Sequence, residues 1–354
     1  MKTNNLKILL TAMSAAKANA LPIESALFLT KDGFLRSTVE QNIYCRPADF
    51  PEGMPAVYCV ELKRFKDLLP SGSVEVLPIL PATPEKFAFL MGRAKYEGEN
   101  LHHIDDAPDH QIIGVEKKSL RLPADVLIKS LKFVGNDDLR PAMQGVNIRK
   151  VAASVAIEAT DAHRLIQTII PAEDTGEEFS YIIPPNTLKV LASSKPNGEI
   201  LINATEDARR ISLSWTDQYG NGWGVDTLPI DAIYPNIEAV MPDLSSLKSA
   251  KVSPSKWVEA LKVAEKGSNP VTKQVHVNGR ITAEDLEYNT AFSVPSPDET
   301  GIDAHFNASI LGFCFSMMDG EDVRLHYNPE NKARAVVLTD GLSKVLCMPV
   351  VVKP

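Results

Sequence analysis

Residues 151–170 of this 354-residue chain, VAASVAIEATDAHRLIQTII, carry the pattern that decides the fold. The pattern predicts a strand over 153–160, a turn at Asp161 and Ala162, and a return strand over 164–170. Aspartate suits such a turn because its side chain can hydrogen-bond to the backbone a few residues further on. We therefore predict a β-hairpin with an aspartate, a histidine and an arginine gathered at its turn.

The hairpin belongs to a unit that occurs three times along the chain. Each copy opens with an amphipathic helix and a proline, which are followed by a strand, a turn and a second strand. The helices are predicted at 5–17, 123–134 and 253–266, and the strand pairs at 25–38, 145–160 and 273–285. The prolines are Pro22, Pro141 and Pro270, which lie 119 and 129 residues apart, so each copy has the size of a small domain.

A second helix and a further strand complete each copy. The helices are predicted at 60–69, 184–195 and 307–318, and the strands at 73–80, 199–205 and 322–328. The turns of the earlier strand pairs are predicted at Asp32-Gly33, near Arg149-Lys150 and at Asn278-Gly279, and Asp-Gly and Asn-Gly are strong hairpin signals. The sequence thus predicts an α+β protein of three tandem domains of similar topology, over 1–113, 114–243 and 244–354.

Cysteine usage and hydropathy indicate the compartment. The four cysteines show no CxxC spacing and predict buried thiols in a reducing environment; they are Cys45, Cys59, Cys314 and Cys347. The first twenty residues end in a small-x-small triplet, as short signal peptides do, but their apolar residues at helical spacing fit an amphipathic helix better. No stretch approaches the ~18 apolar residues of a membrane span. We expect a cytoplasmic protein.

Charge is distributed unevenly along the chain. A formal net charge of -8 on its own argues against a nucleic-acid partner. The five predicted helices other than 307–318, however, hold twelve basic and five acidic side chains, which is a surplus of seven positive charges. Helices commonly carry lysine on a solvated face, so the surplus has an ordinary structural explanation. It also fits a basic surface that contacts phosphates without reading bases.

Several stretches, in order along the chain, resemble the bacterial DNA polymerase III beta subunit, the DNA sliding clamp. They are ALPIESALFL (20–29) for its first strand, LRPAMQGVNI (139–148) with EATDAHRL (158–165) for its middle-domain signature, YPNIEAVMP (234–242) for the close of that domain, and HFNASIL (305–311), DGEDVRLHY (319–327) and VLCMPVVV (345–352) for its C-terminal domain and tail. The resemblance extends along the whole chain and is strongest after residue 120.

This resemblance implies a head-to-tail homodimer that forms a six-domain ring, with helices lining the hole and sheets outside. Such a ring is a processivity factor in DNA replication, which encircles double-stranded DNA without sequence specificity and has neither enzymatic activity nor a cofactor. The side chains expected to face DNA are basic ones of the helices and of one loop, namely Lys17, Lys63, Lys129, Lys132, Arg140, Lys189, Lys256 and Lys262.

The resemblance also places the hairpin in the wall of a cleft between the middle and C-terminal domains. In the family this cleft binds short apolar peptides of DNA polymerase, clamp-loader and repair proteins. The residues carried over to the wall are Met143, Thr160, His163, Arg164, Leu165, Pro235, Val240, Leu346, Cys347, Met348, Pro349 and Val350. Its apolar members would supply contact area, while His163 and Arg164 are expected to orient the peptide by hydrogen bonds.

Two positions of the cleft depart from the family. Ala162 stands where glycine is usual, and Ala239 stands where an arginine is common. The C-terminal tail is also more aliphatic than is usual. These departures leave the preferred peptide open.

The predicted dimer contact departs further. Lys266 and Gly267 replace apolar residues at the end of the third domain's first helix. The opposite edge, in the first domain, holds Tyr96 and Glu97. We expect a dimer interface at Tyr96, Glu97 and Lys266 with more ion pairing and less apolar burial than is usual, and such pairs are sensitive to salt.

Two other functions remain as alternatives. One is a non-ring interaction scaffold with the same fold and cleft. The other is a hydrolase built around 102–110 or 161–163, which lacks support because no GxSxG, HExxH or P-loop pattern occurs. The stretch 102–110 holds residue types that could ligate a metal, His102, His103, Asp105, Asp106 and His110, but the family has an acidic connector without a metal here, so we predict none.

Overall fold

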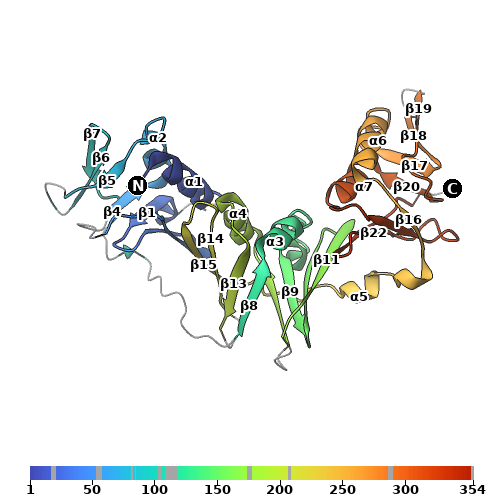
Figure 1. The fold of residues 1–354 in the computed structure, drawn as a ribbon, viewed down its shortest axis with the longest axis horizontal. Helices are drawn as coiled ribbons and strands as arrows, with labels where there is room; N and C mark the ends of the chain where they lie inside the picture. Colours follow the sequence, from blue (N-terminus) through green and yellow to red (C-terminus); the bar gives the residue numbers. More distant parts are fainter. Residues whose placement is uncertain are drawn as a thin grey trace. The chain divides into compact units, whose positions relative to one another are not determined.

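The computed structural model describes residues 1–16, 21–52, 58–80, 83, 85–102, 106–107, 118–173, 178–205, 209–285 and 290–351. These residues hold seven α-helices and twenty-three β-strands and fold as two compact units (Figure 1). The first unit consists of Met1–Leu131 with Ile183–Asp231, and the second of Lys132–Ile182 with Ala232–Pro354.

An eight-stranded antiparallel sheet forms the centre of the first unit. Its strands lie in the order β4-β1-β2-β3-β15-β14-β13-β8. They are β1 (Ala26–Leu29), β2 (Phe34–Ser37), β3 (Gln41–Arg46), β4 (Tyr58–Glu61), β8 (Lys118–Pro123), β13 (Glu199–Ala204), β14 (Ile211–Thr216) and β15 (Gly222–Thr227). The pairing of β3 with β15 joins the two halves of the sheet, with Gln41 opposite Thr227 and Arg46 opposite Gly222. Segments far apart in the sequence therefore share one hydrogen-bonded ladder.

A smaller sheet of the first unit has three strands, β5 (Val76–Pro78), β6 (Lys86–Met91) and β7 (Ala94–Glu99), in that order. The N-terminus covers the β5 edge, because Met1 O accepts a hydrogen bond from Val76 N at 2.7 Å and Thr3 N donates to Val74 O at 2.9 Å. Within the described residues, β7 is therefore the open edge of this sheet.

Four helices pack on one another in the first unit. They are α1 (Thr3–Ser14), α2 (Leu62–Leu68), α3 (Ala124–Leu131) and α4 (Pro185–Ser194). The helix α1 contacts both α2 and α4, and α3 contacts α4. The apolar residues of α1 at helical spacing are buried, as the pattern predicts; they are Leu6, Leu9, Leu10 and Met13.

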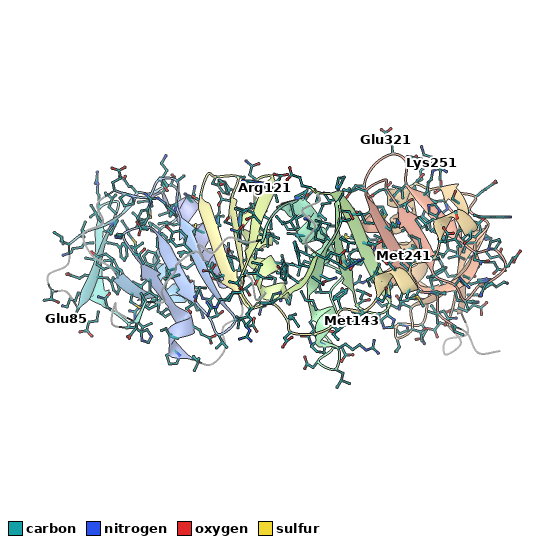
Figure 2. All side chains as sticks on the ribbon, turned by 90° about the horizontal axis from the view of Figure 1, so that it is seen from below. Glu85, Arg121, Met143, Met241, Lys251 and Glu321 are labelled. Carbon is teal, nitrogen blue, oxygen red and sulfur yellow. The ribbon has the colours of Figure 1, made fainter. Side chains whose placement is uncertain are left out.

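The second unit contains another eight-stranded antiparallel sheet, in the order β12-β9-β10-β11-β23-β22-β21-β16. Its strands are β9 (Val146–Val151), β10 (Ser154–Thr160), β11 (Arg164–Pro171), β12 (Phe179–Ile183), β16 (Lys248–Lys251), β21 (Arg324–Tyr327), β22 (Val336–Thr339) and β23 (Ser343–Cys347). Here β11 and β23 join the two halves. Lys251 and Glu321 lie at one rim of this unit (Figure 2), where Lys251 Nζ is 3.9 Å from Asp322 Oδ1.

A four-stranded sheet, in the order β19-β18-β17-β20, completes the second unit. Its strands are β17 (Gln274–Asn278), β18 (Arg280–Asp285), β19 (Thr290–Pro295) and β20 (Asp303–Asn307), and the helices of this unit are α5 (Ile237–Val240), α6 (Pro254–Lys266) and α7 (Ala308–Ser316). The helices α6 and α7 pack together, and α6 contacts β17, β18 and β19. Val350 N donates to His305 O at 2.8 Å on the far side of β20. Among the described residues, β19 is thus the open edge.

The helices and strands predicted from the sequence are largely confirmed, including the hairpin turns at Asp32-Gly33 and Asn278-Gly279. The turn predicted near Arg149-Lys150 is wrong. The strand β9 runs on to Val151 because Lys150, only 5% exposed despite its charge, pairs with Val155. The chain turns instead at Ala152, whose φ is 49°.

Two further predictions concern boundaries. The helix predicted over 123–134 ends at Leu131, so Lys132 lies outside it. The proposed domain boundary near 113 falls outside the described residues. Both eight-stranded sheets cross the predicted boundaries, since β3 pairs with β15 and β11 with β23, and for this reason the two contact units do not coincide with the three predicted domains. The three-domain division stays a prediction.

Candidate partner-binding site

The turn of the β10–β11 hairpin is held by its own polar side chains. Asp161 Oδ1 accepts hydrogen bonds from His163 N and Arg164 N, each at 3.0 Å. Thr160 Oγ1 donates to Arg164 O at 2.8 Å and accepts from Ala162 N at 3.1 Å. The turn and the backbone-binding role predicted for Asp161 are confirmed. Ala162 has a φ of 73°, a left-handed conformation that favours glycine.

The C-terminal strand lies directly beside this hairpin. Arg164 pairs with Cys347 and Leu165 with Leu346 across β11 and β23. Beyond the end of β23, Met348 N donates to His163 O at 2.9 Å. The structure thus brings together residues that are about 180 positions apart in the chain.

An apolar cluster lies beneath this pairing. Leu165 and Leu346, which are 3% and 2% exposed, cluster with Ile237 and Val337. The partly buried residues packed against them are Tyr234, Met241, Leu244 and Ala335. The segment 234–244 therefore covers the face that Leu165 and Leu346 share. Pro235 and Val240, which the sequence assigned to the same site, belong to this segment, and Val240 is 52% exposed.

Met143 adjoins the same turn. Its carbonyl oxygen accepts a hydrogen bond from Gly135 N at 2.8 Å. A Cβ placed on Gly135 would lie 3.6 Å both from Met143 O and from Asp161 Cα, so the segments that hold these residues run close together here. Figure 2 labels Met143 and Met241, which border this site from different segments. All twelve residues predicted for the wall lie in the second unit.

Arg164 is engaged in contacts that the sequence did not indicate. Its Nε donates to Asp161 Oδ2 at 2.9 Å, and its Cζ lies 3.7 Å from the centre of the Phe313 ring. The Phe133 ring meets Phe313 edge-on at 5.1 Å and is 5.8 Å from the same guanidinium. The Arg164 side chain is 20% exposed and links the hairpin to α7. His163, by contrast, is exposed.

A buried carboxylate positions the segment that covers the cluster. Glu158 of β10 is 1% exposed and accepts hydrogen bonds from Asn147 Nδ2 at 2.9 Å and Gln167 Nε2 at 3.0 Å. Arg149 Nη2 lies 3.3 Å from Glu158 and 2.8 Å from Glu238 of α5. Burial and the nearby Glu158 charge raise the pKa of Tyr234, whose hydroxyl points to Glu158 O. This network ties α5 to the sheet.

The thiols of the site are buried, as predicted for all four cysteines, which are free. Cys347 of β23 lies against Cys314 of α7. The contact with that second thiol and the burial together raise the pKa of the Cys347 thiol well above its usual range. A protonated, inaccessible thiol acts as a small apolar side chain.

The basic residues predicted to face DNA fall in both units. Lys63, Lys129 and Lys189 belong to α2, α3 and α4 of the first unit, and Lys132, Arg140, Lys256 and Lys262 to the second. Exposed side chains among them are those of Lys63, Lys132, Arg140, Lys189, Lys256 and Lys262. Arg140 Nε is 3.6 Å from Asp137 Oδ2. Lys17 lies outside the described residues.

The residues predicted for the dimer contact lie on or near the two open strands. Tyr96 and Glu97 are on β7, where Glu97 pairs with Lys95 at 3.2 Å. Lys266 is the last residue of α6, which packs against β19. Within the described part of the chain these side chains are at least partly accessible.

Most of the potential metal ligands of the stretch 102–110 lie outside the described residues. The structure describes only His102, Asp106 and Ala107 of this stretch. His103, Asp105 and His110 lie outside the described residues. No group of three or more potential metal ligands occurs among the residues that the structure describes. No described helix is long and apolar enough to cross a membrane.

Comparison with known proteins separates sequence from fold. No protein-family model matches the chain, and no curated protein matches it in sequence. Solved structures match along its whole length. The DNA polymerase sliding clamp from Pseudomonas aeruginosa, solved with a ligand, gives a TM-score of 0.82 at 17% identity over 99% of both chains.

Two clamps from other bacteria agree with this result. The beta subunit from DNA polymerase of Streptococcus pyogenes gives a TM-score of 0.81 at 17% identity over 99% of both chains. The DNA polymerase III beta subunit from Thermotoga maritima gives 0.79 at 16% identity, over 100% of this chain and 99% of that chain. The chain therefore has the fold of the DNA sliding clamps, and the α+β fold predicted from the sequence is confirmed.

Proposed function

We propose that this protein is a DNA sliding clamp, a processivity factor that encircles duplex DNA and tethers a DNA polymerase to it. The observation that carries this proposal is the match of the whole fold to DNA polymerase sliding clamps over 99% of both chains. The clamp does no chemistry of its own, so we assign it no enzymatic activity and no cofactor. The buried, free thiols fit a reducing cytoplasm.

Pairing of the open sheet edges supports the dimer in this proposal. Each eight-stranded sheet consists of two groups of four strands. The groups join where β3 pairs with β15 in the first sheet and where β11 pairs with β23 in the second. Among the described residues, two strand groups have no such partner: β19-β18-β17-β20 ends on β19, and β5-β6-β7 ends on β7. Pairing β19 of one copy with β7 of the next, twice, would close two chains into a ring of six domains.

Basic residues of the helices and of the segments beside them supply the contact with DNA in this proposal. The assigned residues are Lys17, Lys63, Lys129, Lys132, Arg140, Lys189, Lys256 and Lys262. A clamp that slides needs weak phosphate contacts without base recognition, and exposed lysines provide contacts of this kind because the screened ion pairs break easily. The acidic remainder of the chain would keep DNA off its other surfaces.

The hairpin and C-terminal strand would bind short apolar peptides of the polymerase and the clamp loader. Exposed aliphatic groups at this place support the assignment, because Val240, Met348 and Val350 are 52%, 41% and 36% exposed. Leu165 and Leu346 form the floor beneath them. The contacts of Arg164 assign it to building the wall, so the exposed His163 becomes the candidate for binding the peptide backbone.

The proposal is tested by solution mass and by retention on DNA. Light scattering across protein concentration at physiological salt should give twice the chain mass of 38.7 kDa. After loading, the protein should stay on closed circular DNA in a gel-filtration column and leave the same DNA once it is cut to a linear form. A stable monomer would contradict the ring and favour the interaction scaffold, and equal retention on both DNA forms would contradict topological binding.

A further inference from the structure

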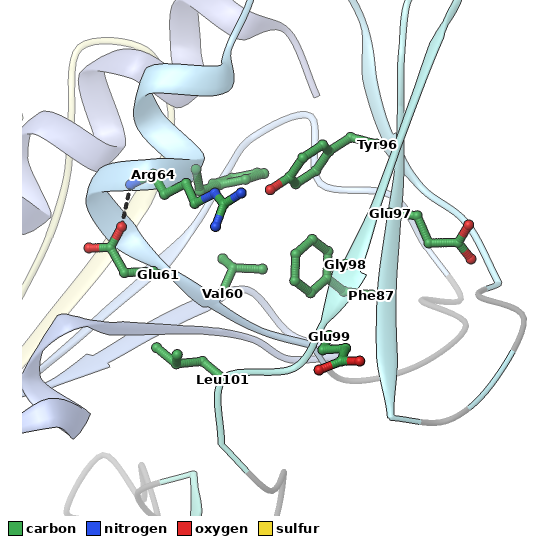
Figure 3. A pocket seen from close by; sticks show the side chains of 10 residues that line it. Val60, Glu61, Arg64, Phe87, Tyr96, Glu97, Gly98, Glu99 and Leu101 are labelled. Atoms are coloured by element: carbon green, nitrogen blue, oxygen red, sulfur yellow. Dashed lines mark hydrogen bonds between the residues drawn. The ribbon is translucent and has the colours of Figure 1, made fainter.

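A pocket of about 390 Å³ opens beside the β7 edge. Apolar side chains and Arg64 of α2 form its walls; the apolar ones are Val60, Phe65, Phe87, Tyr96 and Leu101. Figure 3 shows Arg64, Tyr96 and Phe87 around the space, while Glu97 points away from it. Gly98 belongs to the wall as well, and a Cβ there would fall 2.7 Å from Phe87 Cζ. Glycine therefore allows the Phe87 ring to lie over the strand.

The guanidinium group of Arg64 is available for a contact with a partner in this pocket. Its backbone N–H donates to Oε2 of Glu61, the residue that caps α2, at 2.5 Å. Within the described part of the chain, its guanidinium group has no hydrogen bond or ion pair. The side chain is exposed and borders two aromatic rings, those of Phe87 and Tyr96. An unpaired guanidinium beside aromatic rings favours a further aromatic group, because it can stack on the ring face.

The open edge of the other small sheet carries such a group. Phe292 of β19 is 37% exposed, although large aromatic side chains are usually well covered. It lies over the end of α6, where a Cβ on Gly267 would come within 2.5 Å of Phe292 Cβ. The glycine that departs from the family pattern is therefore what gives Phe292 its place. Val263 of α6, which is 38% exposed, extends the apolar surface of the same helix.

A contact between an arginine and aromatic rings also occurs within the chain. Where β11 pairs with β23, the Arg164 guanidinium lies 3.7 Å from the Phe313 ring, and Phe133 packs edge-on against that ring. An arginine and aromatic rings thus fasten one strand group to another inside the chain.

We propose that Phe292 of one chain occupies the pocket beside β7 of a second copy, where its ring stacks on Arg64 and contacts Phe87. This inference rests on the proposed clamp dimer and names the contact that holds it. Charge is complementary around the contact, since Lys266 ends α6 beside Phe292 and the carboxylates of Glu61 and Glu99 border the pocket. The sequence suggested an interface governed by ion pairs; the position of Phe292 supplies the apolar contact that Lys266 and Gly267 lack.

The dissociation constant of the dimer tests the proposal. In analytical ultracentrifugation, Phe292→Ala and Arg64→Ala should each weaken the dimer about 10- to 100-fold, as truncation of a central aromatic or arginine contact does. Val271→Ala is the matched control, because Val271 is an apolar residue of the same unit, 87% exposed, and should leave the dimer unchanged. Because the Phe292 contact is apolar and aromatic, the wild-type dimer should also persist in 1 M salt, in contrast to the salt sensitivity that the sequence suggested.

Cross-linking locates the contact independently of affinity. Phe292→Cys protein mixed with Tyr96→Cys protein and a mild oxidant should give a disulfide-linked pair of chains, and neither variant should do so alone. A wild-type monomer would overturn both the ring and this contact. A wild-type dimer that is unaffected by Phe292→Ala and gives no cross-link would overturn only the Phe292 contact and leave the clamp proposal standing.

Discussion

Replacing Phe313 with leucine should loosen the joint between the hairpin and α7. The edge-on contact of Phe313 with Phe133 contributes about 0.5–1.5 kcal/mol. The stacked guanidinium of Arg164, 3.7 Å from the ring and 20% exposed, contributes about 1–2 kcal/mol because it is largely desolvated. Leucine keeps most of the apolar contact but neither of these terms. We expect a loss of about 2 kcal/mol in the local free energy of opening.

Native-state hydrogen exchange, read by mass spectrometry on peptides from β11 and β23, measures this loss locally. A double-mutant cycle with Arg164→Met isolates the pair, because the broken Asp161 ion pair cancels between the two arms of the cycle. The coupling between Arg164 and Phe313 should be about 1 kcal/mol. Additivity within about 0.3 kcal/mol would refute the reasoning, since the guanidinium would then gain no stability from the Phe313 ring.

Four further predictions concern single sites. Ala162→Gly should change the melting temperature little, because relief of the left-handed backbone, about 1 kcal/mol, is offset by the greater freedom of glycine in the unfolded chain, whereas Ala162→Val should lower it by several degrees. Lys256→Ala and Lys262→Ala should each reduce the salt dependence of DNA binding by about one unit of slope in a titration at several salt concentrations, and an unchanged slope would remove that lysine from the DNA contact. Burial, and secondarily Arg324, lower the pKa of His326 from its ordinary 6.5, so the folded state binds fewer protons than the unfolded state; stability should be full above pH 6.5 and decline as the pH falls below it, and His326→Gln should flatten that decline in melting curves. Cys347 should resist a thiol reagent until the protein is unfolded, and rapid labelling of the native protein would show that the strand opens.

The sequence by itself determined the local elements. Turn residues such as Asn278-Gly279 and apolar residues at helical or alternating spacing act within a few positions of one another, so they can be recognised without knowledge of the fold. The turn near Arg149-Lys150 was misplaced for the same reason. A charged pair favours a turn locally, but the strand pairing of Lys150 with Val155 prevailed.

Only the tertiary structure decided the environment of the site. The sequence suggested that Arg164 binds a partner peptide, but its side chain contacts Asp161 and Phe313. The residues that pack against Leu165 come from segments near 237 and 346. Phe292 gains its position from Gly267, on another element. Contacts between distant segments depend on which strands pair and which helices cover them, and no local propensity encodes that choice, so the burial and availability of each side chain were set by packing.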